Sequence, residues 1–421
     1  MGRNNYAFLA LDRLLFLSVT ISDVLVIGAG PAGSATALFL ARAGYAVTLL
    51  DRATFPRDKP CGEYLTPGAV RLLRDEMGVL PDLMAGGAAR LTRETVVPHR
   101  ARAWSGPTDA LACPRTVTDR VLRDAAQAAG ANVIEGINVR RILRDVGGVR
   151  GAVGRSDRGE EREFRAQVTV GTDGTRSLLA REMGVVRPVP RLQRIALVTH
   201  YHTDEAFPEA AVTMHLPRDR SDACCGVGAA CGPDGTRNVN IVVPLSEAPR
   251  MAGRRLAYFE ERLRFSFPQV WEKVQGATPA SPLHSVACFG HHTARATDDG
   301  AVLVGDAATF INPFTGEGVF FALRGAQLAA QSIGAALERG DVSRLTLRTY
   351  DAARRAELLP RYRLCDAVQR VVHSPALLGW ASERLRRSEP LAETVLRTIG
   401  DLARPADLFS LATLRLALSS F

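Results

Sequence analysis

A glycine-rich turn near the start of the chain has the spacing to hold a phosphate group. Its residues are Gly28, Gly30, Pro31, Ala32 and Gly33. The turn follows an apolar run, residues 24–27, and precedes a helix-like segment, residues 34–42. The first glycine permits a tight turn, the second lets the backbone approach a pyrophosphate, and the third lets the helix pack against the strand. The backbone N–H groups and the helix dipole would then hold the phosphates.

An acid follows the next predicted strand, residues 45–50. Asp51, at the end of this strand, could accept hydrogen bonds from a ribose, and Arg52 comes directly after it. A strand, a glycine turn, a helix, a second strand and a terminal acid, in this order, make a complete βαβ unit. The combination predicts a dinucleotide-binding site, whereas the glycine pattern alone would be weak evidence.

Three turns further along the chain contain residues of the same kinds. They are Asp173 and Gly174, then Gly305 and Asp306, then Pro313, Gly316, Glu317 and Gly318. The first two turns follow apolar runs, residues 168–171 and 301–304, and the third opens a helix-like segment, residues 319–335. An aspartate at the mouth of a strand can accept a hydrogen bond from a sugar hydroxyl. Glycines in the third turn let the backbone approach a flat ring closely.

In this order the motifs resemble those of glutathione-reductase-type FAD proteins, and within them the geranylgeranyl reductase and aromatic hydroxylase superfamily. Residues 59–62, Lys-Pro-Cys-Gly, look like the KPCG loop of the geranylgeranyl reductase branch, and Gly-Glu-Gly at 316–318 is also nearer to that branch. Arg115 and Asp119 are similar to the superfamily's R-x-x-x-D-x-x-L entry to a helix. The resemblance covers residues 21 to 340 and implies the fold of this superfamily.

The resemblance implies FAD as the cofactor. The residues that it places around FAD are Gly28, Gly30, Pro31, Ala32, Gly33, Asp51, Arg52, Cys61, Gly62, Arg115, Asp173, Gly174, Gly305, Asp306, Pro313, Gly316, Glu317 and Gly318. Asp306 would accept a hydrogen bond from the ribitol chain, and the positive end of the helix after Gly318 would stabilise a reduced flavin. No second G-x-G-x-x-G turn follows a strand. NAD(P)H is therefore expected as a transient donor at the cleft, with a separate electron carrier as the alternative.

The side chains that could move a proton near the flavin are Cys61, Glu63, Tyr64, His200, His202, His291 and His292. Of these, Cys61, Glu63 and His291 are our catalytic candidates. Cys61 lies in the KPCG loop, which the resemblance places near the flavin ring, with a structural buried thiol as an equal alternative. Glu63 could act as an acid facing the ring, against a default expectation of surface exposure. For His291 the alternative is a half-buried structural histidine.

Several reactions remain open for such a site. The KPCG and Gly-Glu-Gly motifs favour hydride transfer through FAD to or from a C=C bond of a hydrophobic small molecule: an isoprenoid, a quinone or a polyketide. The first alternative is an NAD(P)H-dependent monooxygenase that hydroxylates an aromatic or polyketide substrate. The second is a non-redox flavoprotein cyclase or binding module. Residues 225–231 are small where isoprenoid reductases carry Y-x-W-x-F-P, which counts against an isoprenoid, and the tryptophans of flavin halogenases are missing there too.

We predict an α/β fold: a glutathione-reductase-type FAD-binding Rossmann domain with an inserted antiparallel-sheet substrate domain and a C-terminal helical region. Strands near residues 93–112 are expected to contribute to the substrate domain. Four prolines after residue 345 are expected to limit each C-terminal helix to about three turns. The predicted parts are an N-terminal extension (1–20), the FAD-binding domain (21–187 and 290–340), the substrate domain (188–289) and the helical region (341–421).

Composition narrows the range of partners. The 53 basic and 44 acidic residues give a net charge of +9, but the basic residues are scattered with no run of five, so we expect no nucleic acid partner. The seven cysteines include no CxxC pair, which argues against a metal site and for a reducing, cytoplasmic location. Arginines mixed with apolar residues at 361–387 would suit peripheral contact with a membrane. A helical lid with a solvated outer face is the alternative.

Overall fold

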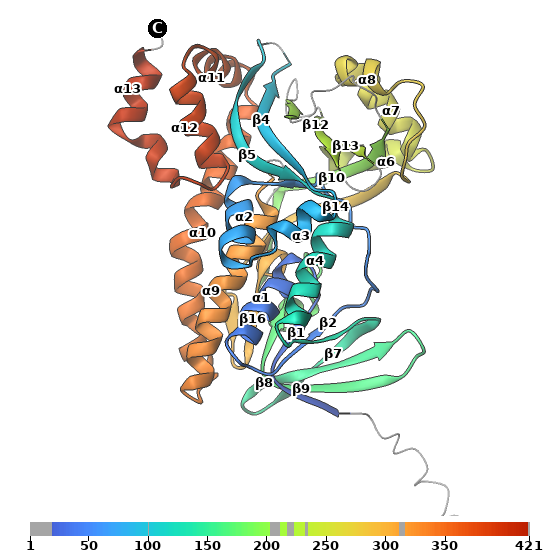
Figure 1. Cartoon of the computed structure of the whole chain (residues 1–421), viewed down its shortest axis with the longest axis vertical. Helices are drawn as coiled ribbons and strands as arrows, with labels where there is room; N and C mark the ends of the chain where they lie inside the picture. Colours follow the sequence, from blue (N-terminus) through green and yellow to red (C-terminus); the bar gives the residue numbers. More distant parts are fainter. Residues whose placement is uncertain are drawn as a thin grey trace, which may run out of the picture.

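The computed structural model describes residues 19–99, 101–202, 211–216, 223–231, 235–310 and 316–419. Over these residues the chain forms two sheets, one below the other in Figure 1, with helices at the sides. Most of the predicted N-terminal extension, together with Pro313 in the third downstream turn, lies outside the described residues. None of the described helices combines the length and the apolar character needed to cross a membrane.

The first sheet carries the predicted dinucleotide unit. Its parallel strands, in spatial order, are β16 (Ala301–Leu303), β9 (Glu161–Gly171), β1 (Val19–Ile27), β2 (Val47–Leu50) and β6 (Asn132–Ile134). Residues 24–27 of β1 are fully buried, as expected of a strand covered on both faces. The antiparallel strands are β7 (Ile137–Asp145) and β8 (Gly148–Ser156), which extend the sheet from β9, and β15 (Thr297–Asp298) at its edge.

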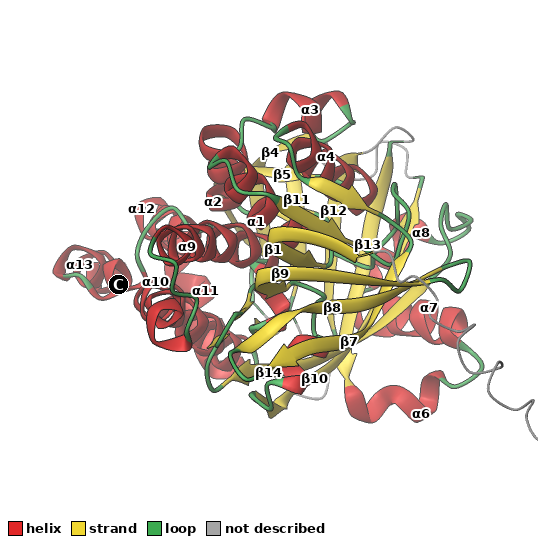
Figure 2. Ribbon diagram, turned by 90° about the horizontal axis from the view of Figure 1, so that it is seen from below, coloured by secondary structure: helices red, strands yellow, loops and turns green. Residues whose placement is uncertain are grey.

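Helices α1 (Pro31–Arg42), α4 (Arg115–Ala128) and α9 (Gly318–Glu338) pack side by side over the first sheet, as Figure 2 shows. The shorter helices are α2 (Pro67–Arg71), α3 (Leu80–Ala85), α5 (Leu178–Glu182) and α6 (Ala248–Met251). The predicted short strand at 168–171 is the end of the 11-residue β9. The first part of β9 pairs with β8. This part has charged residues on one face, so it lacks the continuous apolar run from which the end of the strand was predicted.

The second sheet contains nine strands within the described residues. In spatial order they are β17 (Thr309–Phe310), β14 (His284–Thr293), β10 (Val186–Tyr201), β13 (Thr236–Pro244), β12 (Cys224–Cys231), β11 (Ala211–His215), β4 (Ala89–Val97), β5 (Trp104–Ala112) and β3 (Tyr64–Leu65). All neighbours are antiparallel except β11 and β4, which are parallel. One face packs on α7 (Arg255–Ser266) and α8 (Pro268–Val274). The predicted domain boundaries near 187 and 290 stay predictions, and both fall within long strands of this sheet.

The C-terminal helices lie on the side of the molecule opposite α7 and α8 (Figures 1 and 2). They are α10 (Arg344–Val372), α11 (Pro375–Arg387), α12 (Glu389–Ile399) and α13 (Leu411–Ser419). The expected limit of about three turns on helix length is wrong for α10. This helix is 29 residues long and contains Pro360 in its interior. Packing against α9 outweighs the hydrogen bond lost at Pro360. Pro375 and Pro390 instead lie in first turns, where proline is favoured.

Candidate cofactor and active site

The carboxyl ends of the parallel strands bring the predicted turns together. Gly28 follows β1, Asp51 follows β2, Thr172 follows β9 and Gly305 lies two residues beyond the end of β16. Helix α1 begins at the same edge, immediately after Gly30. Ligands of doubly wound sheets bind at this edge, so the topology itself assembles the site.

The three glycines of the first turn have two different roles. A Cβ atom on Gly28, whose φ is 104°, would lie 2.8 Å from the carbonyl oxygen of Thr172, and one on Gly33 would lie 1.8 Å from the carbonyl oxygen of Gly28. A Cβ atom on Gly30 would meet only the Arg57 guanidinium, at 3.7 Å. The first and third glycines therefore allow close backbone packing, whereas the second borders open space that a ligand could fill.

The turn after β16 packs directly on the start of α1. A Cβ atom on Gly305 would lie 2.8 Å from the Cβ of Ala32, and the φ of Gly305 is 62°. Only glycine allows this approach, which places the neighbouring Asp306 beside the phosphate turn. Thr172 connects the end of β9 to the end of β1. Its hydroxyl lies within hydrogen-bond distance of the carbonyl oxygens of Ile27 and Gly28, at 2.7 Å in each case.

Asp51 is buried and its carboxylate is held by the backbone. One oxygen accepts the N–H of Ala29 at 2.7 Å and the other accepts the N–H of Ala53 at 2.9 Å. Each oxygen keeps a lone pair, so the carboxylate could still accept from a ribose. Arg52 is exposed. Asp173 accepts the N–H of Leu178 at 2.8 Å and so begins α5, which gives this carboxylate a structural contact as well.

Three cations surround one buried carboxylate next to Gly30. Arg115 donates twice to Asp119, at 2.8 and 2.7 Å, and Arg57 lies 2.9 Å from the same carboxylate, whose side chain is fully buried. Burial lowers the pKa of Lys59, and the neighbouring Arg115 lowers it further, while Asp306 opposes the change. The positive excess suits a pyrophosphate. Arg57 and Lys59 were missed as cofactor candidates, although both lie in the loop that contains the KPCG motif.

Glu63 is buried, contrary to the default expectation of exposure, because it faces β10 of the second sheet. Its carboxylate lies 3.0 Å from Nε2 of His200, whose Nδ1 lies 2.9 Å from Oγ of Ser281. Burial alone would lower the pKa of His200, but the hydrogen bond and charge of Glu63 outweigh burial and raise it. The two side chains form a partly enclosed acid–base pair.

The loop that carries Cys61 is fixed between this pair and the cations. Asn238 on β13 donates to the carbonyl oxygen of Cys61 at 2.8 Å, and the Cys61 side chain interacts with Arg115. The hydroxyl of Tyr64 donates to Glu94. The ring of Tyr64 packs against the third glycine turn, since a Cβ atom on Gly316 would lie only 2.6 Å from it. The KPCG loop therefore connects the phosphate side of the site to the third glycine turn.

A family model described as FAD binding domain matches residues 21–358. The chain belongs to this FAD-binding family. The menaquinone reductase of Mycolicibacterium smegmatis is 32% identical over 74% of this chain and 76% of that protein. The digeranylgeranylglycerophospholipid reductase of Methanosphaerula palustris is 28% identical over 94% of this chain and 99% of that protein. The flavin-dependent brominase Bmp2 shares the fold, with a TM-score of 0.81 at 21% identity over 95% of this chain and 98% of its own.

The protein is thus an FAD-dependent oxidoreductase, and its residues fit the cofactor. The open space at Gly30 and the positive excess of the three cations match a pyrophosphate. Asp51 would hold the adenosine ribose and Asp306 the ribitol. Gly318 begins α9 with no atom within 4 Å of the position of a Cβ, so the backbone there is open to a ring. Bound FAD supplies hydride or electron transfer that no side chain can.

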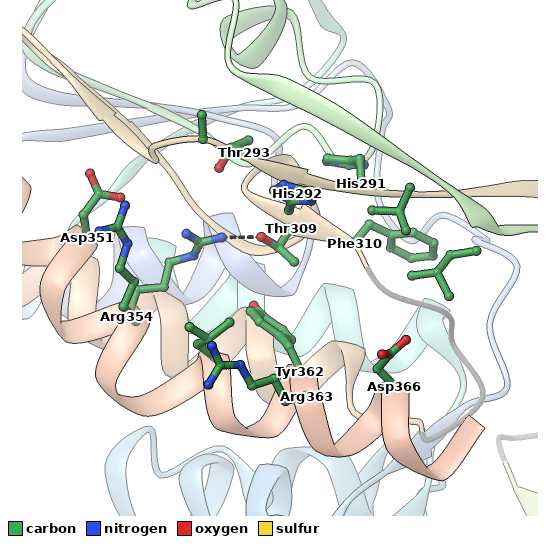
Figure 3. A pocket seen from close by; sticks show the side chains of 15 residues that line it. His291, His292, Thr293, Thr309, Phe310, Asp351, Arg354, Tyr362, Arg363 and Asp366 are labelled. Atoms are coloured by element: carbon green, nitrogen blue, oxygen red, sulfur yellow. Dashed lines mark hydrogen bonds between the residues drawn. The ribbon is translucent and has the colours of Figure 1, made fainter. Parts of the chain in front are cut away.

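His291 and Glu317 lie away from the Glu63–His200 pair in this FAD-dependent oxidoreductase. His291 is buried on β14 and borders a pocket against α10, whose lining does not include Glu63 (Figure 3). The Glu317 carboxylate accepts from Sγ of Cys365 on α10 at 2.6 Å, so its side chain points to the C-terminal helices. Contacts of these two side chains with FAD or substrate stay predictions.

Glu317 belongs to a buried acidic pair with Asp401. Asp401 lies 3.0 Å from Nη1 of Arg361 and accepts from the hydroxyl of Thr66 at 3.0 Å. Burial raises the pKa of Asp401 to about 7 despite Arg361. Burial, and then the charge of Asp401, raise the pKa of Glu317 well above its ordinary value. Glu317 connects the third glycine turn to α10, and Asp401 connects α10 to Thr66 at the start of α2.

We expect the free energy of unfolding to fall as the pH rises from about 4 to about 7, the pKa of Asp401, because the folded state holds these protons more tightly than the unfolded chain. A pKa raised by one unit in the folded state changes the free energy of unfolding by about 1.4 kcal/mol across this pH range. Urea unfolding at several pH values should show a flatter pH dependence for Glu317→Gln, since glutamine cannot ionise. The control Glu272→Gln changes an exposed side chain and should keep the wild-type slope. An unchanged slope in Glu317→Gln would show that Glu317 is ionised throughout.

Proposed function

We propose that this protein is an FAD-dependent reductase that transfers hydride through FAD to a C=C bond of a hydrophobic small molecule, an isoprenoid or a quinone. The observation that supports this most directly is the Glu63–His200 pair beside the KPCG loop. Net reduction of a C=C bond requires a hydride and a proton. The bound flavin supplies the hydride, so the chain must supply the proton or admit water for it.

His200 has the properties of the proton donor. The hydrogen bond and charge of Glu63 raise the pKa of His200 above its ordinary value, which favours the protonated imidazole. Glu63 stabilises the protonated ring through Nε2, and Ser281 holds the ring through Nδ1. The side chains of His200 and Glu63 are 15% and 5% exposed, so the pair is shielded from solvent and His200 keeps some access to a substrate. In this proposal Glu63 orients the imidazole of His200 and favours its protonated form, and His200 donates the proton to the substrate.

The surroundings and the relatives support the substrate class. Helices α10 and α11 pack on the second sheet through a small apolar cluster: Leu216, Cys224, Val372 and Leu378. Two of the relatives are named as reductases of menaquinone and of digeranylgeranylglycerophospholipid. NAD(P)H is our proposed donor, docking transiently at the cleft.

The decisive experiment is anaerobic single turnover of the reduced protein with a prenylated naphthoquinone and a geranylgeranyl lipid as acceptors. Flavin oxidation is followed by absorbance, and the product is analysed by mass spectrometry for the gain of two hydrogen atoms. We expect His200→Gln to slow turnover by about 100-fold or more, as for a lost general acid. The control His202→Gln alters an exposed neighbour and should react like the wild type.

The pH profile separates the roles of the two residues. An acid acts only while protonated, so the wild-type rate should fall as the pH rises through the raised pKa of His200. Glu63→Gln should move this fall to lower pH, because the neighbouring charge is gone. Equal rates for His200→Gln and the wild type would contradict the assignment. A transient near-ultraviolet absorbance on mixing the reduced protein with oxygen, together with a hydroxylated product, would favour the monooxygenase instead.

A further inference from the structure

A pocket of about 360 Å³ lies between β14, β17 and α10, with β10 closing one side (Figure 3). Its size is within the range of small-molecule sites. Apolar groups from three of these elements line it: Leu192, Phe310, Leu359 and the ring of Tyr362. Neither Glu63 nor His200 is among the residues that line it.

The guanidinium of Arg354 extends into this pocket from α10. The residue is only 8% exposed, donates to the hydroxyl of Thr309 on β17 and interacts with the phenol group of Tyr362. Asp351, one turn earlier on the same helix, is already bound, because it accepts the N–H of Ala296 at 2.8 Å and the hydroxyl of Thr297 at 2.6 Å. Among the described residues, no carboxylate forms an ion pair with Arg354. A buried guanidinium without a counter-charge is costly, so the pocket favours an anion.

The other charged groups around the pocket increase this preference. Arg355 and Arg363 also line it. The second acid in the lining, Asp366, is paired with Arg370 at 2.5 Å. Both acids in the lining therefore have cationic or donor partners of their own. The apolar side chains leave room for a hydrocarbon body beside the charged group.

The pocket also shares a wall with the cofactor site. Asp306 lies three residues before Thr309, and the carbonyl oxygen of Ala308 accepts the N–H of Thr293 on the neighbouring strand β14 at 3.1 Å. The electrostatic influence of Asp306 reaches Tyr362 in the lining. We propose that this pocket binds an organic carboxylate, with the carboxylate on Arg354 and the apolar body between β17 and α10, next to the turn that would hold the ribitol. This site does not depend on the reaction proposed above.

Calorimetric titration of the FAD-loaded protein with 2-naphthoate, benzoate and decanoate tests the proposal, with 2-naphthamide as the neutral isostere. We expect saturable binding of at least one carboxylate and much weaker binding of the amide. Arg354→Met should weaken carboxylate binding by about tenfold or more, since a charge-assisted hydrogen bond is lost. Arg354→Lys should retain part of the affinity for the carboxylate, because lysine keeps the positive charge. Arg348→Met, an exposed site on the same helix that does not line the pocket, should bind like the wild type.

Two measurements keep the result interpretable. FAD content and unfolding temperature show whether Arg354→Met is folded, and the comparison of naphthoate with naphthamide in the wild type needs no variant at all. Equal affinity for both isosteres, or no saturable binding of any carboxylate, would overturn the proposal. Competition between the bound carboxylate and the quinone acceptor would identify the site as part of the substrate cleft. Non-competitive inhibition or activation would identify a separate effector.

Discussion

Gly30→Val is expected to give a folded protein that no longer retains FAD, whereas Gly33→Ala is expected to prevent stable folding. A side chain at Gly30 would enter the open space beside Arg57, where the pyrophosphate would lie. We expect FAD affinity to fall by about 100-fold or more, equal to about 2.7 kcal/mol. A methyl group at Gly33 would lie 1.8 Å from the carbonyl oxygen of Gly28. Helix α1 would have to move away from β1, at a cost of about 3 kcal/mol or more.

Flavin-to-protein ratio, circular dichroism and urea unfolding distinguish the two outcomes. Gly379→Ala is the matched control, because a Cβ there meets nothing within 4 Å and the residue is in the helix α11. This substitution should be neutral or stabilising by about 1 kcal/mol. A yellow, FAD-saturated Gly30→Val protein would disprove the assigned phosphate site. Wild-type stability of Gly33→Ala would show that α1 can move without cost.

The sequence was sufficient for the parts of the site that depend on local signals. The turn at Gly28–Gly33 requires glycine for backbone reasons, and Asp51 follows an apolar strand, so each could be placed from neighbouring residues alone. The order of the strands brought these turns to one edge, because parallel strands share the direction of their carboxyl ends. Local chemistry and topology together therefore predicted the cofactor edge.

The Glu63–His200 pair could not be predicted, because its members are far apart in the chain and meet only when the loop docks on the second sheet. No local pattern distinguishes a glutamate that will be buried by β10 from one that faces water. Pro360 gave a wrong prediction for the same reason. Proline usually ends a helix, but tertiary packing stabilises α10 on both sides of this residue. Side-chain partners across sheets are set by docking geometry, which composition and periodicity do not contain.

The pocket at Arg354 was also out of reach of the sequence. His291 was a candidate because of its residue type, but its neighbours on α10 lie about 60 residues further along the chain. Arg354 has no carboxylate partner among the described residues, and Asp351 on the same helix instead accepts the N–H of Ala296. Such a preference for an anion is a property of the assembled pocket, which no single segment reveals.

Asp119→Asn is expected to make the stability of the fold strongly dependent on FAD. The Asp119 carboxylate is fully buried and is shared by Arg115 and Arg57, with Lys59 close by. Removing its charge leaves Arg115 and Arg57 without the carboxylate that they share, and breaking a buried ion pair in this way costs about 3–5 kcal/mol. The apoprotein should therefore lose much of its stability. A bound pyrophosphate would restore negative charge at this point, so FAD should recover a large part of the loss.

Urea unfolding of apoprotein and FAD-loaded protein, each at low and high salt, measures this recovery. The stabilisation by FAD should be larger in Asp119→Asn than in the wild type, and added salt should reduce the difference because it screens the cations. Asp124→Asn, a partly exposed aspartate on the same helix, should lose less than about 0.5 kcal/mol with or without FAD. An equal loss in both states of Asp119→Asn would mean that the carboxylate acts only in packing α4. In that case the three cations would not face the cofactor, and the phosphate site would have to be sought elsewhere along the edge of the sheet.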